Sequence, residues 1–579
     1  MAQVPFPSCR GPAAEPRRAR ARVALTALAL ACAAVLAGCG SGHGSGTSAA
    51  PAVAVPASAA LYAEALVRPE GAEKADALAV GRSLAHGANP YLALLGALQT
   101  PGSPRPGFNS DVARWLGPRA GIFLTSTSGS GALLKLAESG LLGAASSAAG
   151  ITFGSEGLQG ALVMDTSDVS AARSFLEAAA RRAGAHARSY RGVGIRSTDS
   201  GLAFAVVDRY AVIGSEAALH SVIDTVRGGP ALAHAAGYAK LASDAPAGAI
   251  AHLYSSPGAG GAAAPSGMLA LLSGSREANI SLVPAAGSAT LDADTLLGAS
   301  TGAAGGLLSS ISEGAPALAQ LPAGSWLAVG LSHLGQTLGQ DAAGVEELAS
   351  LVASPTAPAG GGGLVSLESL IAAVVKPLQA LGADTASARA DFTSWMGSGG
   401  IFASGAGLLE LKAAVVIESN DPARSKAAVG ELAAALRAAG DSTERVSLPG
   451  TEASAGVRVT GLPLILYIAD GRGSDGRAEF VLGLGEASVT AALHPSGTLA
   501  RSAALSADAA HLGEGIKPSV AVEVPTVVGL LESLQLTEEP AIAKLLPPLR
   551  AVTTVAAGGR RLGSEVERLA LYVGLRAAG

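Results

Sequence analysis

Asp292 and Asp294 form a carboxylate pair, with one residue between them, in a segment that reads as a β-strand. Because alternate side chains of a strand point to the same face, both carboxylates would lie together. Paired carboxylates can act as general acid and base, or can bind calcium, although calcium needs several further oxygen ligands. A solvent-facing strand explains the pair more simply, so we expect both aspartates to be exposed.

Other catalytic motifs are missing from the sequence. The G-x-S-x-G nucleophile motif does not occur, and a phosphate-binding P-loop is excluded because no Gly is followed by Lys. The nine histidines form no His-Glu-x-x-His motif, and His220 and His234 are more simply explained as hydrogen-bonded or solvated side chains. Gly192-Val-Gly194 and Gly483-Leu-Gly485 begin like dinucleotide-binding loops, but both lack the third glycine. We therefore predict no catalytic residue, no cofactor and no metal site.

Cys39 is the residue with the most definite predicted chemistry. Arginines between positions 10 and 22 precede an uncharged apolar stretch from Val23 to Leu36, and Ala37-Gly38-Cys39 follows. This order resembles a bacterial lipoprotein signal peptide over residues 1–38, cleaved before a cysteine that carries diacylglycerol as a thioether. The apolar stretch is shorter than the roughly 20 residues of a transmembrane helix, so an uncleaved anchor is the weaker alternative.

The remaining cysteines and the segment after Cys39 agree with this prediction. Cys9 and Cys32 lie inside the leader, so we expect neither a disulfide nor a cysteine-based metal site in the mature chain. Residues 39–56 are rich in Gly, Ser, Ala and Pro and predict a flexible tether. We expect a protein anchored by lipid to the extracytoplasmic face of the cell membrane.

The composition suggests a large globular body beyond the leader. Hydrophobic residues make up 49% of the 579 residues and charged residues 15%, which predicts an Ala-rich interior and more than one domain. Aromatic residues amount to only 3%, and the net charge is -5. These values disfavour nucleic acid as a partner, because there is neither a basic surface nor a supply of stacking side chains.

A motif occurs twice in the body. The first copy comprises Asp111, Trp115 and Gly117, the second comprises Asp391, Trp395 and Gly397, and each copy is followed by Gly-Ile-Phe. The surrounding patterns recur in the same order: a Pro-Ala step into a strand, a helix, the motif, a strand and helix, a hairpin, a short helix and two closing strands.

This recurrence predicts two tandem units of the α+β class, each a mainly antiparallel sheet with helices packed on one face. We place them at residues 57–300 and 321–579, with a linker at 301–320. Asp421 is expected to cap a helix, Gly184 and Gly440 to end helices, and Asp208-Arg209 to form a hairpin turn.

Two interpretations of the repeated tryptophans remain open. Trp115 and Trp395 could form a paired aromatic contact for a ligand or partner. Alternatively, each fills the core of its own unit while Gly117 or Gly397 ends the preceding helix. Recurrence favours packing, since both units must solve the same packing problem.

The Pro-Ala openings, the Trp-(Leu/Met)-Gly motif and the closing strand pair, behind a lipoprotein leader, resemble the bacterial family called domain of unknown function 3352. The resemblance covers about residues 50–579. The family is found mainly among high-GC Gram-positive bacteria. It implies location and architecture and supplies no catalytic residue.

Three functions are compatible with these observations. The first is a non-catalytic envelope lipoprotein that binds an unknown partner or shapes the cell surface. The second is a carrier of lipids or other apolar ligands, held under a curved sheet. The third is a hydrolase whose residues are assembled from distant positions.

Overall fold

The computed structural model describes residues 50–85, 107–126, 153–154, 158–256, 277–297, 307–340, 391–407, 410–438, 440–458, 464–538 and 540–576. The predicted leader, Cys39 and most of the tether lie outside these residues. So does the run of Leu367, Leu370, Ile371, Val374 and Leu378, whose spacing predicts a helix, and so do most of two Gly/Pro-rich segments, 255–266 and 353–363, which predict loops. Within the described part of the chain, no helix has the length and apolar character needed to cross a bilayer.

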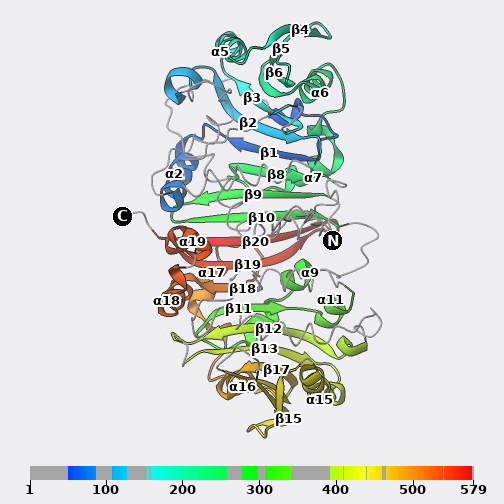
Figure 1. The fold of residues 1–579 in the computed structure, drawn as a ribbon, viewed down its shortest axis with the longest axis vertical. Coiled ribbons are helices and arrows are strands. Elements are labelled where there is room, and N and C mark those ends of the chain that lie inside the picture. The colour runs from blue at the N-terminus through cyan, green and yellow to red at the C-terminus, as the bar shows by residue number, and fades with distance from the viewer. Residues whose placement is uncertain are drawn as a thin grey trace, which may run out of the picture.

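The described strands form one 20-stranded sheet whose pairings are all antiparallel. Figure 1 shows the strands stacked along the long axis of an elongated molecule. From one end to the middle they are β4 (His186–Tyr190), β5 (Val193–Ser197), β6 (Leu202–Val207), β7 (Tyr210–Ser215), β3 (Gly160–Thr166), β2 (Leu116–Leu124), β1 (Leu61–Leu66), β8 (Ala251–Ser255), β9 (Ala278–Ala285) and β10 (Ser288–Leu296).

The sheet continues through the pairing of β10 with β20. From that junction to the other end the strands are β20 (Val566–Leu575), β19 (Val552–Leu562), β18 (Val520–Glu523), β11 (Ser325–Leu331), β12 (Met396–Ser404), β13 (Lys412–Ser419), β17 (Ala478–Leu484), β16 (Ile465–Arg472), β15 (Thr451–Arg458) and β14 (Ser442–Arg445). Read outward from the junction, the two halves have the same strand order.

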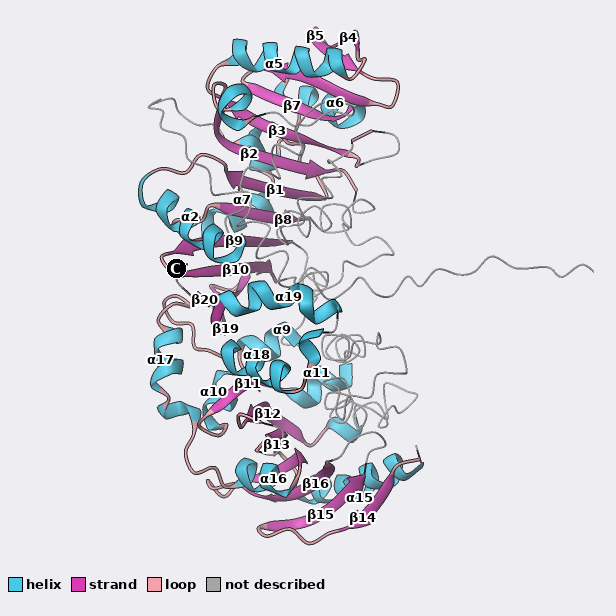
Figure 2. Ribbon diagram, turned by 60° about the vertical axis from the view of Figure 1, so that its left-hand side comes forward, coloured by secondary structure: helices cyan, strands magenta, loops and turns pink. Residues whose placement is uncertain are grey.

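Helices lie along the whole length of the sheet, from α5 at one end to α15 at the other (Figure 2). The first half contains α2 (Gly71–Ala85), α5 (Val169–Arg182), α6 (Glu216–Val226) and α7 (Ala236–Asp244). The second contains α9 (Leu307–Ser312), α10 (Ala315–Gln320), α11 (Leu334–Gln340), α15 (Pro422–Ala438), α16 (Glu486–Leu493), α17 (Ala503–Ala509), α18 (Val524–Ser533) and α19 (Pro540–Ala551). Single turns occur at Pro51–Val53, Phe108–Val112, Leu232–His234, Leu499–Arg501 and Leu536–Glu538.

The α+β class with a large antiparallel sheet is confirmed, but the prediction that helices pack on one face is wrong. In β3, Leu162 and Met164 belong to one core cluster, whereas Ala161 and Val163 belong to another. Helix α5 packs in the first cluster and α6 in the second, so both faces of the sheet are covered. Every residue of β3 is buried, and its apolar run from Ala161 to Met164 exposes no polar face, so this strand requires a cover on each side.

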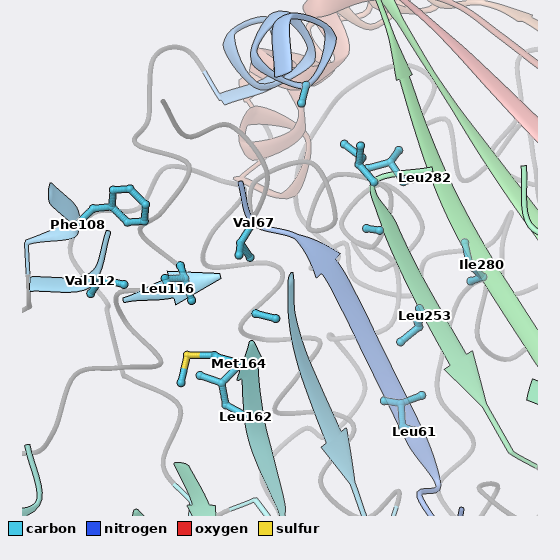
Figure 3. Close-up of a cluster of buried hydrophobic side chains, with 14 of the residues drawn as sticks. Leu61, Val67, Phe108, Val112, Leu116, Leu162, Met164, Leu253, Ile280 and Leu282 are labelled. Atoms are coloured by element: carbon cyan, nitrogen blue, oxygen red, sulfur yellow. The ribbon is translucent and has the colours of Figure 1, made fainter. Parts of the chain in front are cut away.

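Figure 3 shows part of the first cluster, in which Leu61, Leu253, Ile280 and Leu282 of β1, β8 and β9 lie on a common apolar face. Because strand side chains alternate, the residues between them point to the opposite face of these central strands.

Several local predictions are confirmed. Asp421 accepts two amides at the start of α15 as predicted, and the Asp168 carboxylate likewise accepts the Ala171 amide at the start of α5. Gly184 and Gly440 follow these helices with φ of +69° and +97°. Asp208 and Arg209 form the turn between β6 and β7. The predicted linker at 301–320 is different, because two short helices, α9 and α10, occupy most of residues 307–320.

Candidate functional site

Polar side chains gather on the face of the central strands opposite to that drawn in Figure 3. One row runs Glu64, His252, Ser281 and Asp292 across β1, β8, β9 and β10, and each residue is paired with the next. The adjacent row runs Tyr62, Tyr254, Asn279, Asp294 and Arg568, and ends on β20. We call these residues the central polar cluster. All are buried except His252, which is partly buried.

Asp292 and Asp294 lie on the same strand face as predicted, but the expectation that they face solvent is wrong. Asp294 has no exposed surface and Asp292 retains 6%. The cause is tertiary: α7 packs on β9 and β10, and β20 covers the free edge of β10. Neither neighbour can be identified from the local sequence of β10.

Arg568 provides the counter-charge for both aspartates. Its Nε donates to Asp294 Oδ1 at 2.7 Å and its Nη2 donates to Asp294 Oδ2 at 2.8 Å, a bidentate geometry. Its Nη1 lies 3.8 Å from Asp292 Oδ2, and Nη2 also donates to the Asp244 carbonyl at the end of α7. One side chain of β20 therefore connects two residues of β10 with the helix that covers them.

Asp292 is less well compensated than Asp294. Its Oδ1 is buried and has no hydrogen-bond partner among the described residues. Burial raises the pKa of Asp292 to about 6, while Arg568 and Arg560 oppose the rise and Asp294 adds to it. A carboxyl with this pKa can bind and release a proton close to neutral pH.

Glu64 is held at the other end of the cluster. The Tyr62 hydroxyl donates to Glu64 Oε2, and Arg119 Nη1 lies 2.6 Å from Glu64 Oε1. Burial raises the pKa of the Tyr62 hydroxyl well above its usual value, so Tyr62 remains a donor. Gly121 makes room for this ring, because a Cβ there would lie 2.8 Å from the Tyr62 hydroxyl oxygen.

Helix α7 closes the cluster from above. Tyr238 makes edge-to-face contacts with Tyr62 and Tyr254, with ring centroids 5.9 Å and 5.1 Å apart. The Tyr254 hydroxyl donates to Glu277 Oε2 at 2.9 Å. The polar groups therefore lie between the sheet and an aromatic cover.

Ser281 and His252 resemble part of a hydrolytic site. Ser281 Oγ lies 3.1 Å from His252 Nδ1, and Glu64 is paired with His252 on the other side. However, Ser281 has no exposed surface, and both oxygens of Glu64 are bound to Tyr62 and Arg119. Burial also lowers the pKa of His252, although Glu64 opposes this. In this arrangement a substrate cannot reach the hydroxyl, and Glu64 is not available to orient the imidazole.

The second half of the sheet does not repeat the cluster. The positions in β11, β18, β19 and β20 that match in strand order and register hold small or aromatic side chains: Ala328, Gly330, Ser519, Ala521, Ala556, Gly558, Ala570 and Tyr572. The strand order alone therefore does not require buried charge at these positions.

The repeated motif residues are placed in the core or beside it. Trp115 packs 5.2 Å from Phe175 and its Nε1 donates to the Asp111 carbonyl, while Trp395 packs 5.1 Å from Phe480. Both indoles are buried. They belong to different core clusters, so they do not form a paired contact with each other.

The expectation that Gly117 and Gly397 end helices is wrong, because they lie in β2 and β12. A Cβ on Gly117 would lie 2.6 Å from Asp165 Oδ2, and one on Gly397 would lie 3.0 Å from the Glu418 carbonyl. Close approach of the neighbouring strand explains the glycine at each position. The Asp391 carboxylate, which is exposed, lies 3.3 Å from Arg424.

Within the described ranges, no group of three or more His, Cys, Asp or Glu side chains has the geometry to hold a metal ion. His220 stacks on Tyr190 with ring centroids 3.8 Å apart, and His234 lies in the single turn before α7. Neither is part of the central polar cluster.

Comparison of the sequence with known families assigns this chain, with its long antiparallel sheet and helices on both faces, to one family. The chain belongs to the family described as "Protein of unknown function (DUF3352)", whose model matches residues 21–553. No curated protein and no solved structure matches the chain.

Proposed function

We propose that this protein is an exported lipoprotein, anchored through Cys39 to the extracytoplasmic face of the membrane, which binds a partner or ligand without catalysis. The proposal that the protein is not catalytic is supported by the burial of the central polar cluster and by the contacts of its carboxylates. Its carboxylates contact tyrosine or arginine side chains of the same molecule, and its only hydroxyl next to a histidine is inaccessible. We therefore assign the cluster a structural role in the sheet and no part in a reaction.

We also propose that the scaffold consists of two related units, 57–300 and 321–579. The repeated Asp-x-x-x-Trp-x-Gly motif supports this, and so does the matching strand order on each side of the β10–β20 pair. Two isolated bridges add to the correspondence, since Pro56 pairs with Ala231 and Pro322 pairs with Thr498.

The anchor can be tested by metabolic labelling with a radioactive fatty acid in a bacterial host. Cys39→Ala should abolish label on the protein, because the thiol is the acylation site. The matched control is Cys32→Ala, which alters a cysteine that cleavage would remove and should leave labelling intact. Persistent label on the Cys39→Ala protein would contradict the proposal.

The hydrolase alternative is favoured by one observation, the 3.1 Å contact of Ser281 with His252. A fluorophosphonate probe distinguishes it from the binding function. We expect no labelling of the folded protein, because the hydroxyl is buried. Labelling that disappears in Ser281→Ala would establish the hydrolase instead.

A further inference from the structure

A groove lies near one end of the sheet, between α15 and the β14–β15 hairpin. Its volume is about 600 Å³. This falls within the range of ~300–1,000 Å³ that is typical of small-molecule sites. It is far from the central polar cluster in the strand order, because eight strands separate β14 from β20.

The apolar part of the groove consists of small side chains. Val429 and Ala433 of α15 face Ala453 and Ala455 of β15 across it. On α15, Gly430 also lines the groove, and a Cβ added there would meet no atom within 4 Å. Val429, Ala433 and Ala455 form the floor of the groove with only 4%, 6% and 6% of their surface exposed, and the open space lies at Gly430, where an alkyl chain has room.

Two arginines of the groove have no ion-pair partner among the described residues. Arg437 projects from the last turn of α15, and Arg445 stands on β14 opposite Ala455. Residues paired in this way share a strand face, so Arg445 points to the same side as the apolar floor. The third basic residue, Lys426, contacts Glu452 instead, at 3.5 Å.

Thr443 adds a free hydrogen-bonding group. It precedes Arg445 by two residues on β14 and therefore shares its face. Its Oγ1 is buried and has no hydrogen-bond partner among the described residues. Two cations and one hydroxyl thus meet next to an apolar floor.

We propose that this groove binds a free long-chain carboxylate, with the alkyl chain on Val429, Ala453 and Ala455 and the acid between Arg437 and Arg445. Arginine matches a carboxylate through paired, charge-assisted hydrogen bonds. The inference rests on the proposed binding function and specifies its ligand class.

The test uses the full-length protein in its host membrane and a palmitate analogue with a diazirine on the alkyl chain. After illumination, we expect the label within residues 422–458. Excess palmitate should remove it, whereas hexadecyltrimethylammonium should not, because the groove selects a negative head group. Equal competition by the cationic amphiphile, or label mainly elsewhere, would overturn the proposal.

Variants make the test specific. The double variant Arg437→Gln/Arg445→Gln should lower labelling at least tenfold, and Gly430→Phe should do the same by filling the groove. Arg181→Gln is the matched control, since Arg181 occupies the last turn of α5 as Arg437 does in α15. If the double variant fails to fold, Gly430→Phe decides alone, and wild-type labelling of that folded variant refutes the site.

Two outcomes separate this inference from the proposed function. If acylation of Cys39 is intact and no carboxylate probe labels the groove, the ligand class is wrong while the anchored protein stands. If probe in phosphatidylglycerol form labels the groove and the free acid does not, the source is a membrane phospholipid, which also overturns the proposal.

Discussion

At the scale of single residues, Asp292 and Asp294 illustrate what local sequence can and cannot predict. Their spacing correctly predicted a common strand face. Their burial depends on Arg568, which is 274 positions away from Asp294 in the sequence. No local pattern identifies that partner, and the helix that covers the pair is equally invisible from within β10.

Asp292 should make stability depend on pH. Its folded pKa of about 6 exceeds the ordinary value of 3.8, so folding favours the protonated form. The stabilisation from this proton is complete below pH 3.8 and is lost as the pH rises through 6. The shift corresponds to on the order of 3 kcal/mol.

Asp292→Asn should therefore stabilise the protein at pH 7.5 and stabilise it much less at pH 4.5. Thermal unfolding midpoints of wild type and variant at both pH values measure this. Comparing the two proteins cancels the opposite trend of His252, whose lowered pKa favours the neutral imidazole in the folded state. Asp199→Asn in an exposed turn is the control. Equal destabilisation at both pH values would show that Asp292 is charged and well paired.

At the scale of elements, an apolar run such as Ala161-Leu-Val-Met164 is sufficient to predict a strand, but it does not support the prediction that helices cover only one face of the sheet. A strand that is apolar on both sides indicates burial on both faces. Asp421, Gly184 and Gly440 can be predicted as capping residues from the sequence, because each acts on backbone groups within a few positions. The strand positions of Gly117 and Gly397 cannot be predicted in this way, since the atom that excludes a side chain belongs to another strand.

Gly121 provides a test of strand packing. Gly121→Ala places a Cβ 2.7 Å from Tyr62 Cε2. The ring, which also contacts Glu64 and Tyr238, has little room to move, so we expect a loss of about 1–3 kcal/mol. Gly194→Ala in β5 is the matched control, because a Cβ there meets no atom within 4 Å. Chemical denaturation should separate the two variants, and equal stability would mean that Tyr62 is not fixed.

At the scale of the whole molecule, the sheet ends in short, polar strands. β4 is largely exposed and β14 contains Glu444 and Arg445, features that discourage pairing with another sheet edge. The middle is different: β10 and β20 pair along their full lengths, from Ser288 with Gly574 to Leu296 with Val566. The sequence predicts the two closing strand pairs, β9–β10 and β19–β20. It does not predict that β10 pairs with β20, because each of these strands fits the pattern of an edge strand equally well.

Removal of Arg568 tests most directly whether the central polar cluster joins the two halves of the sheet. Arg568→Met leaves Asp292 and Asp294 buried without their main counter-charge, which typically costs ~3–5 kcal/mol. Arg561→Met is the control, since the Arg561–Glu313 pair is exposed at 3.6 Å. Amide hydrogen exchange, followed by mass spectrometry of peptides from β10 and β20, measures the opening of the junction.

We predict that exchange in both strands accelerates about a hundredfold or more in Arg568→Met, and that adding Asp292→Asn and Asp294→Asn restores slow exchange by removing the uncompensated charge. Unchanged exchange in β10 and β20 of Arg568→Met, or acceleration that the two Asn substitutions fail to reverse, would contradict the role of this cluster as the junction between the halves.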